Sequence, residues 1–329
     1  MTKKPVVLAI IGPTASGKSA LAVELARQLG GEVISCDSMQ IYRDMSIGTA
    51  KPGVEEMGGV PHHLIDFLDP SEPFSCSDYA SLARECVDGM IRRGVLPILC
   101  GGTGLYLDAF VRGNSVSRDA DTGADHEYRA TLERIALENG SVALHEMLRK
   151  VDAESAESIH PNNQKRIIRA LEIYHNTGVP KSEHDRRSRE YECPYDMLVI
   201  GLRYADRELL YRRIERRVDK MLSDGLLDEI DALRTRGVFE TSPTASQAIG
   251  YKELLAYFEG VSLDICVEEL KKATRRYAKR QMTWFSRYEN IQWITVDEVS
   301  GEENKAQTFE DIVNIAKKLY AEHINCGIM

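Results

Sequence analysis

The sequence has no long apolar run and few cysteines, and each shortage excludes a class of protein. The longest apolar runs, such as Val6–Ile11, are far shorter than the roughly 20 residues that a membrane-spanning helix requires. The seven cysteines are odd in number and widely spaced, so they indicate neither a disulfide framework nor a CxxC zinc site. We therefore expect a cytoplasmic protein that does not contact a membrane.

The chain also has no excess of positive charge. It contains 42 Lys and Arg against 51 Asp and Glu, which gives a formal net charge of −9. Because affinity for phosphates comes largely from Lys and Arg, this balance alone argues against a nucleic-acid partner. The question therefore depends on local basic segments.

Short apolar runs bounded by glycine or polar residues predict strands at Val6–Ile11, Glu32–Cys36, Val95–Cys100, Met197–Leu202 and Ile291–Val296. Amphipathic helical stretches alternate with them, which favours an α/β fold with a parallel sheet and helices on both faces. Residues 119–192 show no convincing strand and are charged and helical in pattern. We therefore predict a helical insertion domain at 119–192 within a core made of 1–118 and 193–329.

The strongest motif is GPTASGKS, which satisfies the P-loop pattern GxxxxGK[ST] between an apolar strand and a helical pattern. In such a loop, backbone N–H groups and a helix N-terminus surround phosphate oxygens, Lys18 adds positive charge and Ser19 ligates Mg²⁺. We predict a P-loop NTPase-like core that binds a nucleotide or another phosphate chain, against the alternative of a chance glycine-rich turn. The predicted phosphate-binding residues are Gly12, Pro13, Thr14, Ala15, Ser16, Gly17, Lys18 and Ser19.

Two further strands end in groups that suit chemistry at the same edge of the sheet. Asp37 follows the second strand and can accept a proton from a nucleophile, while Gln40 can hydrogen-bond the edge of a base. The strand Val95–Cys100 runs into a glycine-rich turn in which Thr103 has the only side-chain hydroxyl. Two alternatives stay open, since Asp37 could cap a turn and the glycine-rich turn could have no function.

Two helical segments carry arginines and lysines in a pattern. In Arg207–Leu233, apolar residues at three- and four-residue spacing define one face, and Arg213 and Arg217 share a neighbouring face. The segment Lys271–Arg287 has seven Lys or Arg, no acidic residue and interleaved aromatics, as an RNA-binding surface requires. The alternative is a solvated basic face whose aromatics lie in the core.

Seven uncommon sequence blocks follow one another in order: GPTASGKS, DSMQIY, GTAKP, GGTGLY, HPNNQKRIIRALEIYHNTG, QAIGYKE and RRYAKRQMTWF. From the P-loop to about residue 296 they resemble tRNA dimethylallyltransferases, also called tRNA isopentenyltransferases, of bacterial type. The resemblance implies transfer of the dimethylallyl group from dimethylallyl diphosphate to the N6 amine of the adenosine 3′-adjacent to the anticodon. It also implies Mg²⁺, release of diphosphate, and binding of the tRNA anticodon stem-loop by a monomer.

The resemblance further assigns roles to individual residues. It implies that Asp37 takes the proton from the amine, that Thr103 helps to place the reacting groups, and that Arg213 or Arg217 assists the leaving group. Between Ser117 and Arg129 the sequence lacks the proline-rich entry to the insertion that the family usually has. The implied tRNA contacts are Asp37, Ser38, Met39, Gln40, Thr103, Arg129, Lys165, Arg166, Ile167, Ile168, Arg169, Gln247, Ala248, Ile249, Gly250, Tyr251 and Lys252, and the basic charge adds Lys279 and Arg280.

An exocyclic amine is a poor nucleophile, so positioning and neutralisation of the leaving diphosphate must supply most of the acceleration. We therefore expect the base and the diphosphate to enter one water-excluding tunnel from opposite ends. Three alternatives remain open: a small-molecule kinase with ATP in the P-loop, an enzyme that prenylates free adenine nucleotides, and a non-catalytic RNA-binding or nucleotide-sensing protein.

Overall fold

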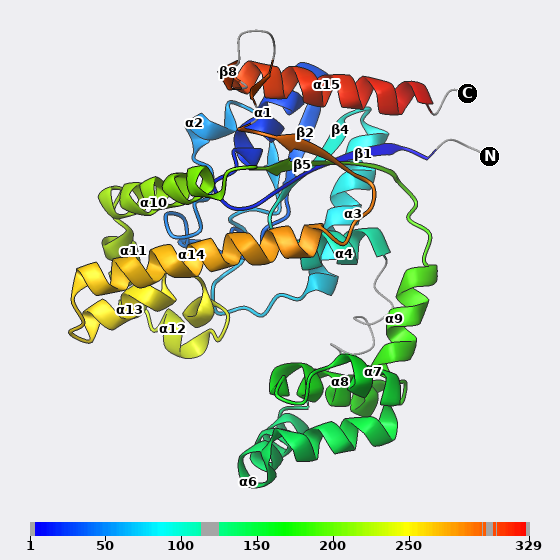
Figure 1. The fold of residues 1–329 in the computed structure, drawn as a ribbon, viewed down its shortest axis with the longest axis vertical. Coiled ribbons are helices and arrows are strands. Elements are labelled where there is room, and N and C mark those ends of the chain that lie inside the picture. The colour runs from blue at the N-terminus through cyan, green and yellow to red at the C-terminus, as the bar shows by residue number, and fades with distance from the viewer. Residues whose placement is uncertain (1–3, 113–124, 298, 301–304, 307, 327–329) are drawn as a thin grey trace. The chain divides into compact units, whose positions relative to one another are not determined.

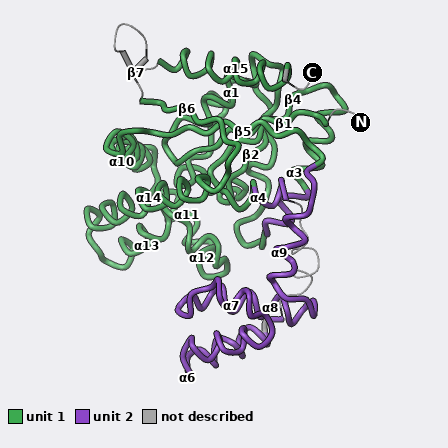
Figure 2. The backbone as a smooth tube through the Cα atoms, turned by 45° about the vertical axis from the view of Figure 1, so that its right-hand side comes forward, with its two compact units in different colours: residues 1–74, 82–107, 194–329 green, residues 75–81, 108–193 purple. Residues whose placement is uncertain are grey.

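The structure, a computed structural model, describes residues 4–112, 125–297, 299–300, 305–306 and 308–326. The chain divides into two compact units, the first made of residues 1–74, 82–107 and 194–329 and the second of 75–81 and 108–193 (Figure 2). The domain boundary predicted at 118–119 lies outside the described residues. None of the described helices is both long enough and apolar enough to cross a bilayer.

The first unit is built on a six-stranded sheet in the order β3-β2-β4-β1-β5-β6, with every pair parallel. The predicted α/β fold with a parallel sheet is therefore confirmed. The sequence missed β3 because its two residues are too few to show a period. The strands are β1 Val6–Ile11, β2 Gly31–Ser35, β3 His62–His63, β4 Leu96–Gly101, β5 Asp196–Arg203 and β6 Ile291–Thr295, and the separate antiparallel pair is β7 Val299–Ser300 with β8 Lys305–Ala306.

The central strand β1 is buried because helices cover both faces of the sheet. Helices α1 (Lys18–Leu29) and α15 (Phe309–Cys326) lie on one face, and α14 (Leu263–Phe285) runs along the other (Figure 1). Leu8 and Ile10 pack into a cluster with residues of α1 and α15, and their neighbours in β1 are equally buried. Burial on both faces explains why this strand is apolar at every position instead of alternating.

Helices of the 207–258 region, together with α14, enclose a second hydrophobic cluster in the first unit. Residues Ile41, Tyr42 and Met45, which follow β2, pack there against helices of the 207–258 region. The helix predicted over Arg207–Leu233 is two helices, because Gly225 adopts a left-handed conformation with φ 98°. The helices of this region are α10 Arg207–Ser223, α11 Leu226–Thr235, α12 Val238–Thr241, the 3₁₀ helix η1 Ala245–Gln247 and α13 Lys252–Phe258, while the short helix α2 Val54–Met57 lies outside the cluster.

The described residues of the second unit form helices only, as the sequence predicts for the insertion. Asn163 accepts a hydrogen bond from Arg166 N and begins α8, while Asp152 accepts one from Ser155 N and begins α7. The core includes Leu132, Leu144 and Leu148 of α6. The helices are α6 His126–Val151, α7 Ala153–Ser158, α8 Gln164–Thr177 and α9 Lys181–Glu190, while α3 Cys76–Arg92 and α4 Gly104–Arg112 contribute residues to both units.

Candidate active site

The glycine-rich loop after β1 has the shape of a phosphate-binding loop. Gly12 and Gly17 have φ values of 151° and 94°, and a Cβ on Gly12 would lie 2.8 Å from the carbonyl oxygen of Leu202. The Lys18 ammonium donates to Pro13 O at 3.3 Å, and burial lowers the pKa of this lysine. The loop therefore presents a helix N-terminus and a partly desolvated cation at the carboxyl edge of the central strand.

Asp37 and Thr103 lie beside this loop because β4 is the neighbour of both β1 and β2. The hydroxyl of Thr103 accepts a hydrogen bond from Ser38 N at 3.1 Å, which joins the two segments. One carboxylate oxygen of Asp37 accepts from Met39 N at 3.0 Å, so this residue does stabilise its turn. Asp37 also lines a cavity, so capping the turn and acting in a site are compatible roles.

Gln281 of α14 connects the P-loop to the glycine-rich turn, a role that was not predicted from the sequence. Its side-chain oxygen accepts from Thr14 N at 2.9 Å, and its side-chain nitrogen donates to Gly102 O at 3.0 Å. A Cβ at position 102 would lie 2.1 Å from that nitrogen, so glycine is required there. The available signal was the helical spacing, which places Gln281 on the buried face with Ala278 and Phe285.

Tyr277 lies one helical turn before Gln281 and faces the same cavity, and its role was also missed. Burial, together with the negative charge of Asp37, raises the pKa of Tyr277, and the Thr103 side chain beside the phenol opposes that rise. The phenol therefore stays protonated at neutral pH. It brings a hydrogen-bonding group next to the two residues that the sequence singled out.

Two cavities meet at the P-loop. The first, of about 420 Å³, is lined by Asp37, Gln40 and Tyr277 among others. The second, of about 690 Å³, lies between the P-loop, residues 46–52 and helix α10. Both are lined by Lys18, Ser19, Ala50, Arg217 and Met221, so the space beside Asp37 adjoins the space beside the phosphate-binding loop.

Arg213 and Arg217 of α10 occupy different surroundings. Arg217 lines both cavities, and burial lowers its pKa against the opposing effect of the Asp37 and Glu56 carboxylates. Arg213 lines only the second cavity, is exposed, and donates through Nε to Ala15 O at 2.9 Å. Arg216 and Lys220 line the second cavity too. Arg216 is three residues after Arg213 and Lys220 is three residues after Arg217, and this helical spacing could have identified both from the sequence.

The basic segment of α14 divides into a paired and an exposed part. Lys271 and Lys272 form ion pairs with Asp219 and Glu269 at 2.8 and 2.7 Å. Lys279 and Arg280 are exposed, and Arg280 also lines the first cavity, 5.6 Å from the Tyr277 ring. Phe285, however, belongs to the core. The core interpretation therefore holds for Phe285, whereas RNA binding by Lys279 and Arg280 stays a prediction.

The segment 247–252 forms another wall of the first cavity. Gln247, Ala248, Ile249 and Gly250 line it. Lys252 is exposed and donates to the Gln247 side chain at 3.1 Å. The Tyr251 side chain, by contrast, is fully buried and donates to Glu229, so a contact of this residue with RNA would have to use its backbone.

In the second unit the predicted tRNA contacts have different exposures. Lys165 and Arg166 are exposed on the first turn of α8, whereas Ile167 and Ile168 are buried in the core. Arg169 lies 3.9 Å from Glu172. Arg129 donates to the same Glu172 at 3.0 Å and to Glu133 at 3.3 Å, so its guanidinium already has two carboxylate partners.

The residues at the P-loop fit a magnesium ion that is held mainly by a substrate. The described residues contain no group of three or more His, Cys, Asp or Glu side chains that could hold a metal alone. Mg²⁺ needs only one or two protein ligands when phosphate oxygens and water supply the others. The exposed hydroxyl of Ser19 lines both cavities and is suited to that role.

Known proteins resemble this chain over nearly its whole length. The IPP transferase family matches residues 40–288, and the isopentenyl transferase family matches residues 5–67. The tRNA dimethylallyltransferase of Geobacillus thermodenitrificans is 49% identical over 324 residues, which cover 98% of this chain and 99% of that protein.

Solved structures also resemble this chain over most of its length. The full-length tRNA isopentenylpyrophosphate transferase from Bacillus halodurans has a TM-score of 0.69 and 43% identity, over 99% of this chain and 100% of that one. A eukaryotic dimethylallyltransferase acting on tRNA has a TM-score of 0.76 and 32% identity, over 88% of this chain and 74% of that one.

Proposed function

Because the chain belongs to the IPP transferase family of tRNA dimethylallyltransferases, we propose that it transfers the dimethylallyl group of dimethylallyl diphosphate to the N6 amine of a tRNA adenosine. The acceptor is the adenosine 3′-adjacent to the anticodon, and diphosphate is released. One observation carries the site assignment: the cavity beside Asp37 and the cavity beside the P-loop share Lys18, Ser19 and Arg217. A nucleophile at one side and a diphosphate at the other would meet there.

Asp37 is the base for the amine. As N6 attacks C1 of the dimethylallyl group, the bond from C1 to the diphosphate oxygen breaks and the amine loses a proton. The Asp37 carboxylate uses one oxygen to accept from Met39 N, so the turn fixes its orientation while its second oxygen takes the proton. Thr103 and the protonated Tyr277 lie beside Asp37 and orient the adenine.

The P-loop, Lys18 and Arg217 stabilise the departing diphosphate. Developing negative charge on the leaving oxygen is stabilised most by cations already fixed in a poorly solvated site. Arg217 meets that requirement because it is partly buried and lines both cavities, whereas Arg213 is exposed and holds Ala15 of the loop. Ser19 would hold Mg²⁺, which would neutralise further charge on the diphosphate.

The RNA base enters through the first cavity and the diphosphate through the second. The first is walled by Gln40, Gly250 and Arg280, and the second by Arg213 and Lys220. The exposed cations Lys279 and Arg280 bind RNA phosphates near the first entrance, and Lys165 and Arg166 bind others from the second unit. A monomer suffices, since all these residues belong to one chain.

A donor-choice experiment tests this function. Purified protein is incubated with unmodified tRNA, Mg²⁺ and either dimethylallyl diphosphate or ATP, and the nucleosides of the tRNA are analysed by mass spectrometry. Isopentenyladenosine should appear with dimethylallyl diphosphate and not with ATP. Consumption of ATP without prenylated nucleoside would favour the kinase, and prenylation of free AMP with no product on tRNA would favour the nucleotide-prenylating enzyme.

A further inference from the structure

One loop contributes to both cavities. We name residues 46–50 the rim loop: Ser46 and Ile47 line the second cavity, Gly48 and Thr49 line the first, and Ala50 lines both. A shift of this loop would therefore change the walls around the diphosphate and around the RNA base together.

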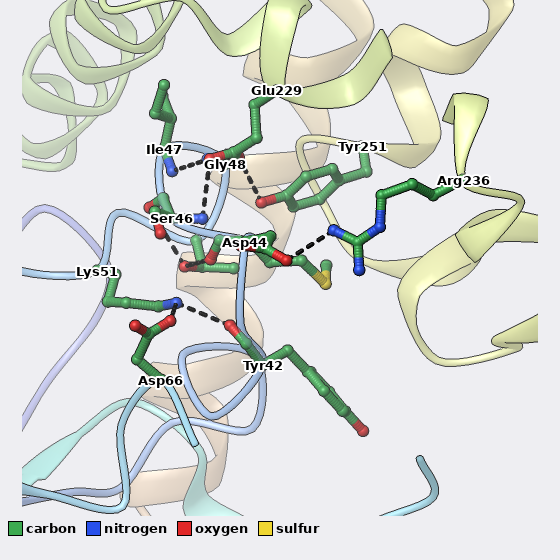
Figure 3. A network of polar contacts seen from close by, with 12 residues as sticks. Tyr42, Asp44, Ser46, Ile47, Gly48, Lys51, Asp66, Glu229, Arg236 and Tyr251 are labelled. Atoms are coloured by element: carbon green, nitrogen blue, oxygen red, sulfur yellow. Dashed lines mark hydrogen bonds and ion pairs between the residues drawn. The ribbon is translucent and has the colours of Figure 1, made fainter. Parts of the chain in front are cut away.

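A single carboxylate holds the first half of the rim loop. Glu229 of α11 accepts hydrogen bonds from the backbone N–H groups of Ser46, Ile47 and Gly48 at 2.9, 2.7 and 3.0 Å. The hydroxyl of Tyr251 donates to it as well, at 2.7 Å (Figure 3). All four partners donate hydrogen bonds, so the side chain at this position must only accept hydrogen bonds. An ionised carboxylate is such a group.

The second half of the rim loop is held from the first cavity itself. The side-chain nitrogen of Gln40 donates to Thr49 O and Ala50 O at 3.4 and 3.2 Å, and Gln40 lines that cavity. Lys51, which follows the loop, donates to Tyr42 O at 2.7 Å and pairs with Asp66 (Figure 3). The orientation of the Gln40 amide therefore depends on where the rim loop lies.

The packing leaves the rim loop little room to move toward α13. A Cβ at Gly48 would lie 2.5 Å from the Tyr251 ring, and a Cβ at Gly250 would lie 3.2 Å from Gly48 O. The tyrosine thus supports the loop by its ring and binds the carboxylate by its hydroxyl. Glu229 is not among the described residues that line either cavity, so it acts only through the loop.

We propose that Glu229 is a positioning residue, whose carboxylate fixes the rim loop so that the walls of both cavities hold the two substrates in line. The inference rests on the proposed function of the site. The inference goes beyond the proposed function, because it assigns the alignment of dimethylallyl diphosphate with the tRNA adenosine to a residue that touches neither substrate. A purely stabilising role would lower the melting temperature without changing turnover by the folded enzyme.

The test uses Glu229→Gln, whose amide places N–H donors against the donors of the loop. Turnover should fall about 10- to 100-fold, with smaller changes in the KM for dimethylallyl diphosphate and for tRNA, because small misplacements of reacting groups cost that much. Assays are run at a temperature at which circular dichroism shows the variant folded. In hydrogen exchange without substrates, the amides of Ser46, Ile47 and Gly48 should lose protection while those of β1 keep theirs.

Two further variants and one control complete the test. Gly48→Ala pushes the rim loop away from Tyr251 without changing the carboxylate, and it should lower turnover too. Tyr251→Phe keeps the ring and three of the four bonds to Glu229, so turnover should fall no more than about threefold. Asp231→Asn, on the same helix but in an ion pair with exposed Arg234, is the matched control and should behave as wild type.

Unchanged turnover in Glu229→Gln would overturn the proposal even if the wild type prenylates tRNA, so its failure is distinct from failure of the proposed function. A loss of turnover with unchanged protection of the three loop amides would overturn it as well. A loss of turnover in Asp231→Asn as large as that in Glu229→Gln would also overturn the proposal.

Discussion

At the scale of single residues, we assign different roles to the two oxygens of the Asp37 carboxylate: one stabilises its turn and the other takes the proton. One oxygen accepts from Met39 N, and the residue lines the cavity, so replacement by Asn keeps the size and most of the turn. Asp37→Asn should reduce turnover by about 10³-fold, because the amide cannot accept the proton. Its affinity for tRNA should stay within about twofold of wild type, since no counterion is lost or gained at the phosphates. Single-turnover kinetics and filter binding measure the two quantities, and near-normal turnover would remove Asp37 as the base.

The contrast between Arg217 and Arg213 gives a second prediction at this scale. Arg217→Gln removes a partly buried cation shared by both cavities, and turnover should fall about 10²- to 10³-fold. Arg213→Gln, the matched exposed residue, should lose less than about tenfold, because water screens it and its contact is to Ala15 O. Steady-state assays with varied dimethylallyl diphosphate compare them. A larger loss of turnover in Arg213→Gln than in Arg217→Gln would mean that Arg213, and not Arg217, stabilises the leaving diphosphate.

Residue roles could be predicted from sequence where a motif has a fixed local shape. The P-loop is such a case, because its function follows from its own backbone. Choosing between Arg213 and Arg217 required knowing which one lies where the cavities meet. Glu229 and Gln281 act across 181 and 267 residues of chain, and no local pattern predicts contacts at that separation.

At the scale of elements, a polar cluster joins β2, β3 and the residue after α3. The buried Glu32 accepts from Arg93 at 2.7 and 2.8 Å and contacts His63 at 2.8 Å. The hydrogen bonds from Arg93 are the main reason that the pKa of Glu32 falls from 4.5 to about 2, although burial opposes the shift. A depressed folded-state pKa stabilises the protein above 4.5, and that stabilisation is lost as the pH falls toward 2.

Glu32→Gln should therefore lower the free energy of unfolding at pH 7 by about 1–2 kcal/mol, since the half-exposed Arg93 is screened by water. The difference from wild type should shrink as the pH falls from 4.5 toward 2. Urea unfolding followed by circular dichroism at several pH values measures it. Glu138→Gln, from an exposed pair in α6, is the control and should change little. A difference that stays constant with pH would contradict the assigned pKa.

The strands of the core were predictable for a physical reason. Burial on both faces makes β1, β4 and β5 continuous apolar runs, and such runs are visible in sequence. The break between α10 and α11 was not predicted, because the apolar face continues on both sides of Gly225. Only the left-handed conformation of that glycine ends the first helix.

At the scale of the whole molecule, the net charge of −9 does not reveal that basic residues are concentrated on α14. Lys271 and Lys272 are neutralised by acidic partners, whereas Lys279 and Arg280 are exposed on the same helix. Composition alone predicted no RNA partner, and the segment pattern predicted one. The structure separates the cations that are paired within the protein from those that are exposed for a partner.

A double variant tests that separation. Lys279→Ala with Arg280→Ala should weaken tRNA binding and reduce the slope of log affinity against log salt by about 2, because about one counterion is released per phosphate contact. Lys271→Ala with Lys272→Ala removes the same charge from paired positions and should change the slope by less than about 0.5. Binding titrations at several salt concentrations give the slopes. Equal slopes for the two double variants would mean that pairing with an acidic side chain does not separate the cations of α14 that bind RNA from those that do not.

The central claim is that donor and acceptor reach one reaction centre through different cavities. A crystal structure with an unreactive thio analogue of dimethylallyl diphosphate and an anticodon stem-loop tests it most directly. The diphosphate should lie against the P-loop beside Arg213 and Lys220, and the adenine should lie beside Asp37 and Tyr277, with C1 of the donor between them near Arg217. Both substrates entering through the same cavity, or an adenine bound away from Asp37, would contradict it.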